Sequence, residues 1–500
     1  SRSLCFPEET LFFALKSERN DGHNYIPELY RRGVKNFVVT DVPKGYASDY
    51  PEANFLKVVN TLEALQRLAE RHRDEFNIPI VGITGSNGKT MVKEWLYQLL
   101  SPSMFVTRSP RSYNSQIGVP LSVWLMNEQT QVGVFEAGIS QPGEMLALRD
   151  IIQPTIAVLT NVGSAHQENF SSLEEKCREK LILFHDAETV VYDGDDEVIT
   201  KVVAEYPDYK GEKLFWSLKN PEAPFYVRKI EKQQSVSVIT YIYKGVEDSF
   251  SIPFIDDASI QNSIICAAVA SKIGLSAEDI DKRMALLEPV AMRLEVKVGQ
   301  HGCTLINDSY NSDINSLDIA LDFMNRRPDH RGRRHTLILS DIYQSGQTPE
   351  ALYKEVSDLA RKRGVVKFIG IGPELCKQHD TIQISEKFFF PNVEEFINSE
   401  VFASLRDEVI LLKGARQFGF DQLTELLVQK VHETTLEVNL NAVVANLNYY
   451  RAFMKPETKL VCMIKADGYG AGAVEIAKTL QDHRVDYLAV AVADEGVTLR

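Results

Sequence analysis

Apolar runs and helical periods alternate along most of this chain. From residue 80 onward, apolar runs at residues 80–84, 133–137, 156–161 and 189–192 occur together with segments of helical period at residues 89–100 and 173–186. Buried strands that alternate with helices predict a parallel, doubly wound α/β sheet. At residues 225–254 the pattern changes to alternating strands, which predicts an antiparallel addition.

The same kind of pattern appears in three further parts of the chain. Residues 1–76 suggest a small mixed α/β unit, with strands at 10–15 and 36–40 and a charged helix at 62–72. A second α/β unit has strands at 304–307, 336–340, 366–371 and 409–412 and helices at 315–324, 350–362 and 420–431. At Thr435 a strand, helix, strand, helix, strand pattern begins, which is typical of the opening of a βα barrel. We therefore predict domains at 1–76, 77–297, 298–432 and 433–500.

Composition narrows the class of protein. Of 500 residues, 44% are hydrophobic and 25% charged, which is ordinary for a globular chain, and the length suggests several domains. The net charge of −14 argues against nonspecific binding to nucleic acid. No apolar run approaches the roughly 18 residues that a membrane-spanning helix needs. The chain starts without methionine and stops within a helical pattern, so we expect it to be a piece of a longer protein.

The cysteines indicate a reducing compartment. They are scattered and include no C-x-x-C pair, which favours reduced thiols in the cytoplasm over a disulfide framework or a zinc site. The six are Cys5, Cys177, Cys266, Cys303, Cys376 and Cys462.

Residues 81–95, VGITGSNGKTMVKEW, have the form of a phosphate-binding loop. A strict G-x-x-x-x-G-K-[ST] loop would need glycine where Ile83 stands, so the tight part is the shorter G-x-x-G-K-T at residues 85–90. The backbone at Gly85 and Gly88 can approach phosphate oxygens, and the helix that follows adds the positive end of its dipole. Lys89 can neutralise phosphate charge and Thr90 can hold magnesium. An ordinary glycine turn followed by an incidental Lys-Thr is the alternative, and the loop alone would equally suit a GTPase, a kinase or a ligase.

Two later segments place polar side chains at predicted strand ends. Glu136 ends a strand in FEAGISQPGE, and His166 follows another in TNVGSAHQENF. Ligands of parallel sheets bind at the carboxyl ends of strands, so this carboxylate and imidazole could hold magnesium near a triphosphate. Each side chain by itself is more simply a solvated strand-end or loop residue.

Several motifs together resemble the Mur ligase family of ATP-dependent amide ligases. They are GITGSNGKT, SYNSQIGVP, FEAGISQPGE, TNVGSAHQENFSSLEEKCREK, PVAMRLEVK, NDSYNS and LLKGAR, which occur in the family's order within about residues 1–432. The N-terminal segment looks like the family's UDP-binding domain. NDSYNS is most similar to the branch that adds D-alanyl-D-alanine to UDP-N-acetylmuramoyl-tripeptide in peptidoglycan synthesis. The resemblance implies a three-domain α/β fold and formation of an amide through an acyl phosphate, with ATP and Mg²⁺.

The resemblance also implies roles for individual residues. The 85–90 backbone (Gly85, Ser86, Asn87, Gly88, Lys89, Thr90) would hold the ATP phosphates, while Asn262 would lie by the adenine, Arg293 by the γ-phosphate and Asp308 by the ribose. Thr90 and Glu136 would bind one magnesium ion, and His166 would help to bind a second. Lys180 falls where the family carries a carbamylated lysine that faces the metal. The substrate cleft would be lined by Asn114, Tyr310, Asn311, Lys413 and Arg416.

The last segment resembles a second family. In CMIKADGYGAG, Lys465 follows an apolar strand, where loss of solvation would favour imine chemistry, although a strand-edge lysine that reaches to water gives the same pattern. LEVNLNAVVANLNYYR, KLVCMIKADGYGAGA and YLAVAVADEGVTLR look like the start of a pyridoxal-phosphate-dependent alanine racemase. The resemblance implies that Lys465 carries the Schiff base to pyridoxal phosphate, that Tyr469 approaches the cofactor phosphate, and that the complete domain forms a homodimer.

Other functions remain possible from the sequence. A folylpolyglutamate synthetase-like ligase would share the loop, and a regulatory nucleotide switch would hydrolyse ATP or GTP without any amine acceptor. A catalytically silent scaffold is disfavoured because Lys89, Thr90, Glu136, His166 and Arg293 are all present. The leading interpretation is a cytoplasmic enzyme of cell-wall synthesis that combines the ligase with the beginning of a racemase.

Overall fold

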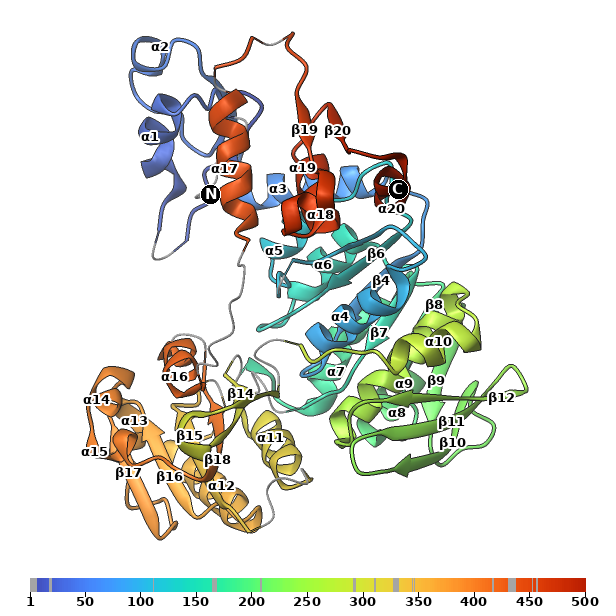
Figure 1. Cartoon of the computed structure of the whole chain (residues 1–500), viewed down its shortest axis with the longest axis vertical. Coiled ribbons are helices and arrows are strands. Elements are labelled where there is room, and N and C mark those ends of the chain that lie inside the picture. Colours follow the sequence, from blue (N-terminus) through green and yellow to red (C-terminus); the bar gives the residue numbers. More distant parts are fainter. Residues whose placement is uncertain are drawn as a thin grey trace. The chain divides into compact units, whose positions relative to one another are not determined.

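The computed structural model describes residues 7–17, 20–110, 112–163, 169–206, 209–290, 294–309, 312–326, 332–343, 345, 347–415, 418–429, 438–451, 453–455 and 457–500. The chain divides into two compact units, residues 65–430 and residues 1–64 together with 431–500. The described strands form four separate sheets (Figure 1).

The central sheet has nine strands in the order β12-β11-β10-β9-β8-β7-β4-β6-β5. Strands β4 to β9 are parallel, β10 pairs parallel with β9, and β11 and β12 continue as an antiparallel meander. The predicted doubly wound sheet and its antiparallel addition at residues 225–254 are therefore confirmed. The strands are β4 (Ile80–Thr84), β5 (Val106–Arg108), β6 (Val132–Glu136), β7 (Ile156–Leu159), β8 (Thr189–Asp193), β9 (Glu212–Ser217), β10 (Phe225–Lys232), β11 (Ser237–Tyr243) and β12 (Val246–Ile252).

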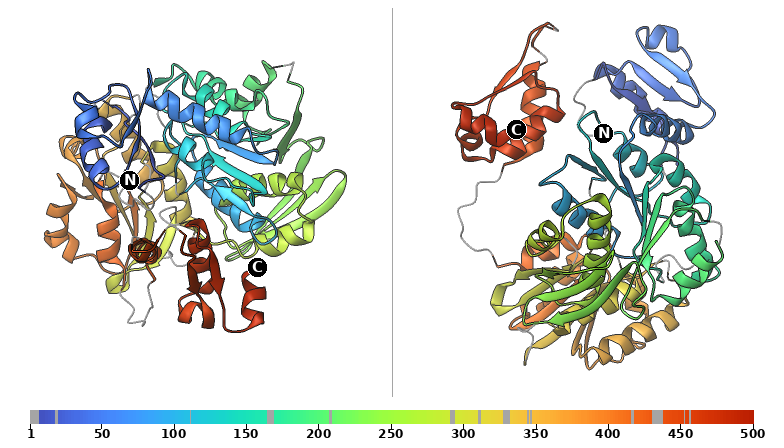
Figure 2. Two further views of the ribbon diagram at one scale, coloured as in Figure 1. Left: turned by 90° about the horizontal axis from the view of Figure 1, so that it is seen from above. Right: turned by 90° about the vertical axis from the view of Figure 1, so that its right-hand side faces the viewer.

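Helices cover both faces of this sheet (Figures 1 and 2). Successive residues of a strand point to opposite faces, so Val81 and Ile83 pack in one apolar core while Ile80 packs in the other. The first core takes its helical side chains from α4 (Lys89–Leu100), α9 (Asp257–Ile273) and α10 (Ala277–Met284). The second takes them from α3 (Thr61–Arg73), α5 (Gly118–Val123), α6 (Glu144–Ile152), α7 (Leu173–Leu181), the turn Ile182–Phe184 and α8 (Glu197–Ala204).

The second sheet of this unit has six strands in the order β13-β14-β18-β15-β16-β17. All pairs are parallel except β13 with β14. Its strands are β13 (Glu295–Val298), β14 (Thr304–Asp308), β15 (Arg334–Ser340), β16 (Lys367–Ile371), β17 (Glu386–Phe390) and β18 (Glu408–Lys413). Its helices are α11 (Ile314–Arg326), α12 (Pro349–Lys362), α13 (Pro373–Lys377), α14 (Val393–Ile397), α15 (Glu400–Ala403) and α16 (Phe420–Leu427).

Two boundaries in this region differ from the sequence expectation. Strand β13 crosses the proposed domain limit at residues 297/298, because it pairs with β14 from Glu295 onward. Helix α16 ends at Leu427 rather than at residue 431, since Val428 is extended and bridges to Gly299. The domain limits themselves stay predictions.

The other unit contains two small sheets. Near the N-terminus, β1 (Leu11–Phe13), β2 (Asn36–Val39) and β3 (Asn54–Lys57) are parallel, and they accompany the turn Gly22–Tyr25, α1 (Ile26–Arg31) and α2 (Tyr46–Asp49). Near the C-terminus, β19 (Val461–Met463) and β20 (Tyr487–Ala489) form a parallel pair, with α17 (Leu440–Arg451), α19 (Ala473–Asp482) and α20 (Ala493–Leu499). A parallel pair joined through a helix is a βαβ unit, as the sequence predicted for the start of a further domain.

The prediction of a strand at residues 435–440 is wrong for residues 438–440, the ones that the structure describes. Residues 435–437 lie outside the described residues, Leu440 already begins α17, and the Asn439 side chain accepts a hydrogen bond from the Ala442 amide at 3.2 Å. Asparagine at that place satisfies one of the free amides of a helix N-terminus, which favours the helix over continuation of a strand. In the part of the chain that the structure describes, no helix is both long and apolar enough to cross a membrane.

A buried ion pair in the six-stranded sheet provides a test of its packing. Lys367 on β16 and Glu408 on β18 lie 2.6 Å apart with side chains 3% and 2% exposed. We expect Glu408→Ala to lower the free energy of unfolding by an amount near the lower end of about 3–5 kcal/mol, because it leaves a buried ammonium group whose remaining acidic neighbour is Glu386 at 3.3 Å. Urea unfolding, followed by a signal specific to this domain, measures the change.

The matched control for that variant is Lys377→Ala. It breaks an exposed pair with Glu374 in the same domain and should change stability by less than about 1 kcal/mol. If both variants lost the same free energy of unfolding, burial would not be what makes the Lys367–Glu408 pair important for stability.

Candidate active site

The loop between β4 and α4 depends on two glycines. Gly85 and Gly88 have φ of 145° and 84°, in the region that favours glycine. A Cβ on Gly85 would lie 1.9 Å from the Thr160 hydroxyl oxygen, and a Cβ on Gly88 would lie 2.5 Å from the Asn262 amide oxygen. The loop therefore lies flat against the end of β7 and against α9, and a side chain at either position would displace it.

Residues after β7 hold the loop by hydrogen bonds. The Ser86 amide donates to the Asn161 carbonyl at 2.9 Å, and the Asn87 amide donates to the Asn161 side chain at 2.9 Å. The Thr160 hydroxyl donates to the Asn87 carbonyl. Thr160 and Asn161 are not among the residues predicted from the sequence, although they begin the TNVG motif, directly after an apolar run and at the sheet edge where ligands bind.

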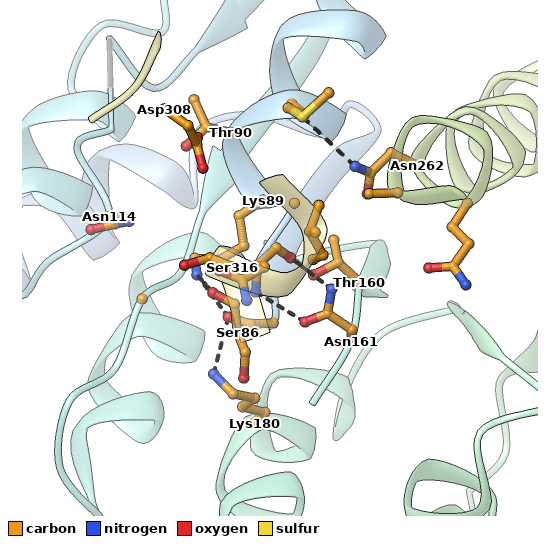
Figure 3. Close-up of a pocket in the computed structure, with 18 of the residues that line it drawn as sticks. Ser86, Lys89, Thr90, Asn114, Thr160, Asn161, Lys180, Asn262, Asp308 and Ser316 are labelled. Atoms are coloured by element: carbon orange, nitrogen blue, oxygen red, sulfur yellow. Dashed lines mark hydrogen bonds between the residues drawn. The ribbon is translucent and has the colours of Figure 1, made fainter. Parts of the chain in front are cut away.

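Lys89 begins α4 and reaches back over the loop. Its ammonium group donates to the carbonyls of Gly85 at 2.7 Å and Ser86 at 3.1 Å. Figure 3 shows its side chain, with Ser86, Thr160 and Asn161, gathered at the loop. The cation and the N-terminus of a twelve-residue helix thus face the same space, which favours an anionic ligand.

Glu136 ends β6 beside this loop and is fully buried. Its Oε2 accepts hydrogen bonds from the Thr90 hydroxyl at 3.2 Å and from the Asn114 amide at 3.4 Å. A carboxylate and a hydroxyl oxygen at this spacing fit Mg²⁺, which takes oxygen ligands and keeps several of its waters. Among the described residues, no three His, Cys, Asp or Glu side chains cluster in a way that could hold a metal. The remaining ligands of an ion here would come from water or phosphate.

A lysine that was not predicted from the sequence lies behind Glu136. Lys93 is fully buried on α4 and its ammonium group lies 3.2 Å from Glu136 Oε1. A signal was available, because Lys93 follows Thr90 by three residues and so shares its helix face. The sequence does not say that the face is buried.

Helix α7 brings two buried lysines toward the loop. Lys180 donates to the Gly85 carbonyl at 3.2 Å, and Lys176 donates to the Gly163 carbonyl. Burial, followed by the nearby Lys89 and Lys176 cations, lowers the pKa of Lys180 well below its usual value. Burial also lowers the pKa of Lys176, to about 8. Both lysines lie on one face of the helix because they are four residues apart.

The six-stranded sheet contributes a buried ion pair to the same space. Asp308 and Lys413 are register partners at the ends of β14 and β18, and their charged atoms are 2.6 Å apart. Both line a cavity of about 380 Å³ that also contains the loop, with Ser316 and Ile319 of α11. The cavity therefore lies between the two α/β sheets of this unit.

The structure brings most of the predicted ligase residues together. Glu136 is bonded to two residues of the cavity wall, and the lining itself includes Gly85, Ser86, Asn87, Gly88, Lys89, Thr90, Asn114, Lys180, Asn262, Asp308 and Lys413. Five predicted residues lie outside the described part of the chain, namely His166, Arg293, Tyr310, Asn311 and Arg416.

Of the two interpretations of the Lys465 pattern, the structure shows the strand-edge lysine that reaches water. Lys465 and Tyr469 are both exposed, and the lysine ammonium group lies 5.9 Å from the centre of the tyrosine ring. They belong to a turn, α18 (Lys465–Gly470), in which residues 466–469 have positive φ. The sheet there has two strands, and both Val461 and Met463 of β19 are exposed, so the strand that precedes Lys465 does not remove it from water.

Comparisons with known proteins agree with this architecture. Residues 83–270 match the family model of the Mur ligase middle domain, and residues 438–500 match that of the alanine racemase N-terminal domain. The UDP-N-acetylmuramoyl-tripeptide–D-alanyl-D-alanine ligase of Bacillus subtilis (strain 168) is 28% identical over 355 residues, which cover 70% of this chain and 74% of that protein. The enzyme of that name from Borreliella burgdorferi is 27% identical over 429 residues, covering 84% and 90%.

Solved structures show the same fold. The crystal structure of MurF ligase from Thermotoga maritima in complex with ADP superposes with a TM-score of 0.70 at 22% identity, and covers 85% of this chain and 96% of that one. Residues 83–270 therefore carry a Mur ligase middle domain and residues 438–500 the start of an alanine racemase N-terminal domain, and the chain is similar over most of its length to the D-alanyl-D-alanine-adding ligases of the Mur ligase family.

Proposed function

We propose that residues up to about 430 form an ATP-dependent ligase that joins D-alanyl-D-alanine to UDP-N-acetylmuramoyl-tripeptide. The observation that carries this proposal is the cavity in which the loop at residues 85–90 and the Asp308–Lys413 pair face one space, with Glu136 hydrogen-bonded to Thr90 of its wall. Relatives named for this reaction, similar over most of the chain, support the choice of substrates.

The reaction has two steps that both develop negative charge. A carboxylate oxygen of the tripeptide attacks the γ-phosphorus of ATP, the bond to the β–γ bridging oxygen breaks, and ADP leaves. The amine of D-alanyl-D-alanine then attacks the acyl carbon of the acyl phosphate, the carbon–oxygen bond to phosphate breaks, and the amine proton passes to solvent. Fixed positive groups aimed at the transferring phosphoryl group lower the barrier for such steps.

The residues of the cavity suit that task. The loop backbone and Lys89 would bind the phosphates, while Asn262 and Asp308 would face the nucleoside. Thr90 and Glu136 would hold one Mg²⁺, and a carbamylated Lys180 would be a further metal-facing carboxylate; a bound Mg²⁺ would neutralise charge on the phosphate oxygens. Asn114 and Lys413 would contact the second substrate. Five residues outside the described part of the chain have proposed roles that rest on the family resemblance alone, namely His166, Arg293, Tyr310, Asn311 and Arg416.

For residues 438–500 we propose a role in alanine racemisation within a larger domain. Lys465 would attach pyridoxal phosphate, which stabilises negative charge on a substrate carbon. Tyr469 would lie near its phosphate, and the domain would form a homodimer. An exposed lysine and tyrosine on one turn do not form a cofactor pocket by themselves. For this segment we therefore propose attachment of the cofactor and no step of racemisation. We also propose a cytoplasmic location, in keeping with the nucleotide substrates and the free thiols of the five described cysteines.

The ligase is tested by phosphate release from ATP. With UDP-N-acetylmuramoyl-tripeptide and D-alanyl-D-alanine together, we expect release with an equal amount of pentapeptide product. Lys89→Ala should lower kcat/KM by about 10²–10³-fold, because a charge that faces the transferring group is lost. Release that does not depend on the dipeptide would support the nucleotide switch instead, and glutamylation of a folate would support the synthetase-like alternative.

Gly85→Ala tests the close fit of the loop. The new Cβ would lie 1.9 Å from the Thr160 hydroxyl in a backbone conformation that costs about 1–3 kcal/mol for other residues, so ADP affinity should fall at least tenfold. Titration calorimetry gives the affinity. Gly245→Ala is the control, since its φ is 78° but no atom lies within 4 Å of the new Cβ. If folded Gly85→Ala bound ADP as tightly as the unchanged protein, the close contact between Gly85 and Thr160 would not be needed for nucleotide binding.

Lys180 should react with carbon dioxide. Its lowered pKa raises the fraction of neutral amine, which is the form that adds CO₂ and releases a proton. In ¹³C-bicarbonate we expect one carbamate resonance, which weakens as the pH falls because the amine becomes protonated. The resonance should disappear in Lys180→Ala and persist in Lys176→Met. A resonance that survives in Lys180→Ala would assign the carbamate to another lysine.

A further inference from the structure

Lys93 is a charged residue in the core of the unit formed by residues 65–430, and the proposed reaction gives this lysine no role. It lies one turn after Thr90 on α4 and its side chain is 0% exposed. A buried ammonium group is costly unless several acceptors surround it. Its contacts therefore indicate what it is placed to do.

One hydrogen bond and two ion pairs hold the Lys93 ammonium group. It donates to the Ser109 carbonyl at 2.9 Å and lies 2.8 Å from Glu94 Oε1 and 3.2 Å from Glu136 Oε1. Glu94 is itself fixed, because its other oxygen lies 3.1 Å from Arg108, whose guanidinium group stacks 3.4 Å over the Tyr97 ring. Opposite charges thus alternate from Arg108 through Glu94 and Lys93 to Glu136.

This arrangement divides the two oxygens of Glu136 between different tasks. Oε1 faces Lys93, whereas Oε2 faces the cavity wall, where Thr90 and Asn114 donate to it. The main chain is held at the same place, because the Glu136 amide donates to the Ser109 hydroxyl at 3.2 Å. Ser109 therefore fixes both the backbone of Glu136 and the lysine that pairs with its carboxylate.

We propose that Lys93 is a positioning residue, which turns Glu136 so that one oxygen, Oε2, is presented to a divalent cation beside Thr90. The proposal rests on the proposed function in one respect, the use of Thr90 and Glu136 as metal ligands. Lys93 touches neither the nucleotide site nor the cation. It acts through Glu136, as groups that orient metal ligands do in other proteins.

The test uses Mn²⁺ as a probe in the presence of ADP and measures free Mn²⁺ by electron paramagnetic resonance. Groups that orient metal ligands typically contribute about 10–100-fold to metal affinity, so we expect a loss of at least tenfold in Lys93→Met. The affinity for ADP without metal should stay within about twofold, because Lys93 does not line the cavity.

A purely structural role predicts a different pattern. Lys367→Met removes a buried lysine from the six-stranded sheet and serves as the control that lowers stability without changing Mn²⁺ affinity. In a Glu136→Gln background, Lys93→Met should cause no further loss of Mn²⁺ affinity if it acts through Glu136. Should Lys93→Met fail to fold, Glu94→Gln removes the outer anchor of the lysine and should weaken Mn²⁺ binding about two- to tenfold, by the same reasoning on a smaller scale.

The outcomes separate this proposal from the ligase assignment. Unchanged Mn²⁺ affinity in folded Lys93→Met or in Glu94→Gln, or additive losses in the double variant, would overturn the role of Lys93. A protein that binds Mn²⁺ with ADP and loses that binding in Lys93→Met, but forms no pentapeptide, would support the positioning role and refute the ligase.

Discussion

The flat contact between the loop at residues 85–88 and the end of β7 is the constraint on which the site depends. Gly85 has no room for a side chain beside Thr160, and the amides of Ser86 and Asn87 are already oriented by Asn161. The direction of the helix that follows, and with it the position of Lys89, depends on this contact. The loop can be shorter than the strict phosphate-binding motif, because hydrogen bonds to Asn161 after β7 fix its backbone in place of further glycines.

Buried lysines, together with the half-buried Lys89, dominate the electrostatics around this loop. Lys89, Lys176 and Lys180 donate to main-chain carbonyls, whereas Lys93 and Lys413 pair with Glu136 and Asp308. Such an arrangement is costly for folding, because each ammonium group loses solvation. It is suited to a polyanionic substrate, whose phosphates add the negative charge that the cavity wall lacks. The lowered pKa values of Lys176 and Lys180 on α7 follow from burial first, and then from repulsion by neighbouring lysine cations.

Two α/β sheets contribute to the one cavity, which explains how a two-substrate reaction is organised. The nine-stranded sheet supplies the phosphate loop, backed by Glu136 through Thr90 and Asn114, while the six-stranded sheet supplies Asp308, Lys413 and part of α11. Asp308 and Lys413 meet because β14 and β18 are parallel and in register, although the residues are 105 positions apart in the chain. The ion pair holds two strand ends in place at the wall of the cavity.

The sequence by itself determined the alternation of strands and helices, the phosphate loop and the resemblance to two families, because apolar periodicity and short motifs are local properties of the chain. Helix α4 begins and ends where the pattern predicts, and Glu136 lies at a strand end as expected. Only the tertiary structure decided which charges are buried. Lys93 and Lys465 both look like lysines beside apolar segments, yet Lys93 is enclosed between a helix and a nine-stranded sheet, whereas Lys465 follows an exposed strand of a two-stranded sheet. Burial depends on which distant segments cover a residue, and this information is not present in the spacing around it.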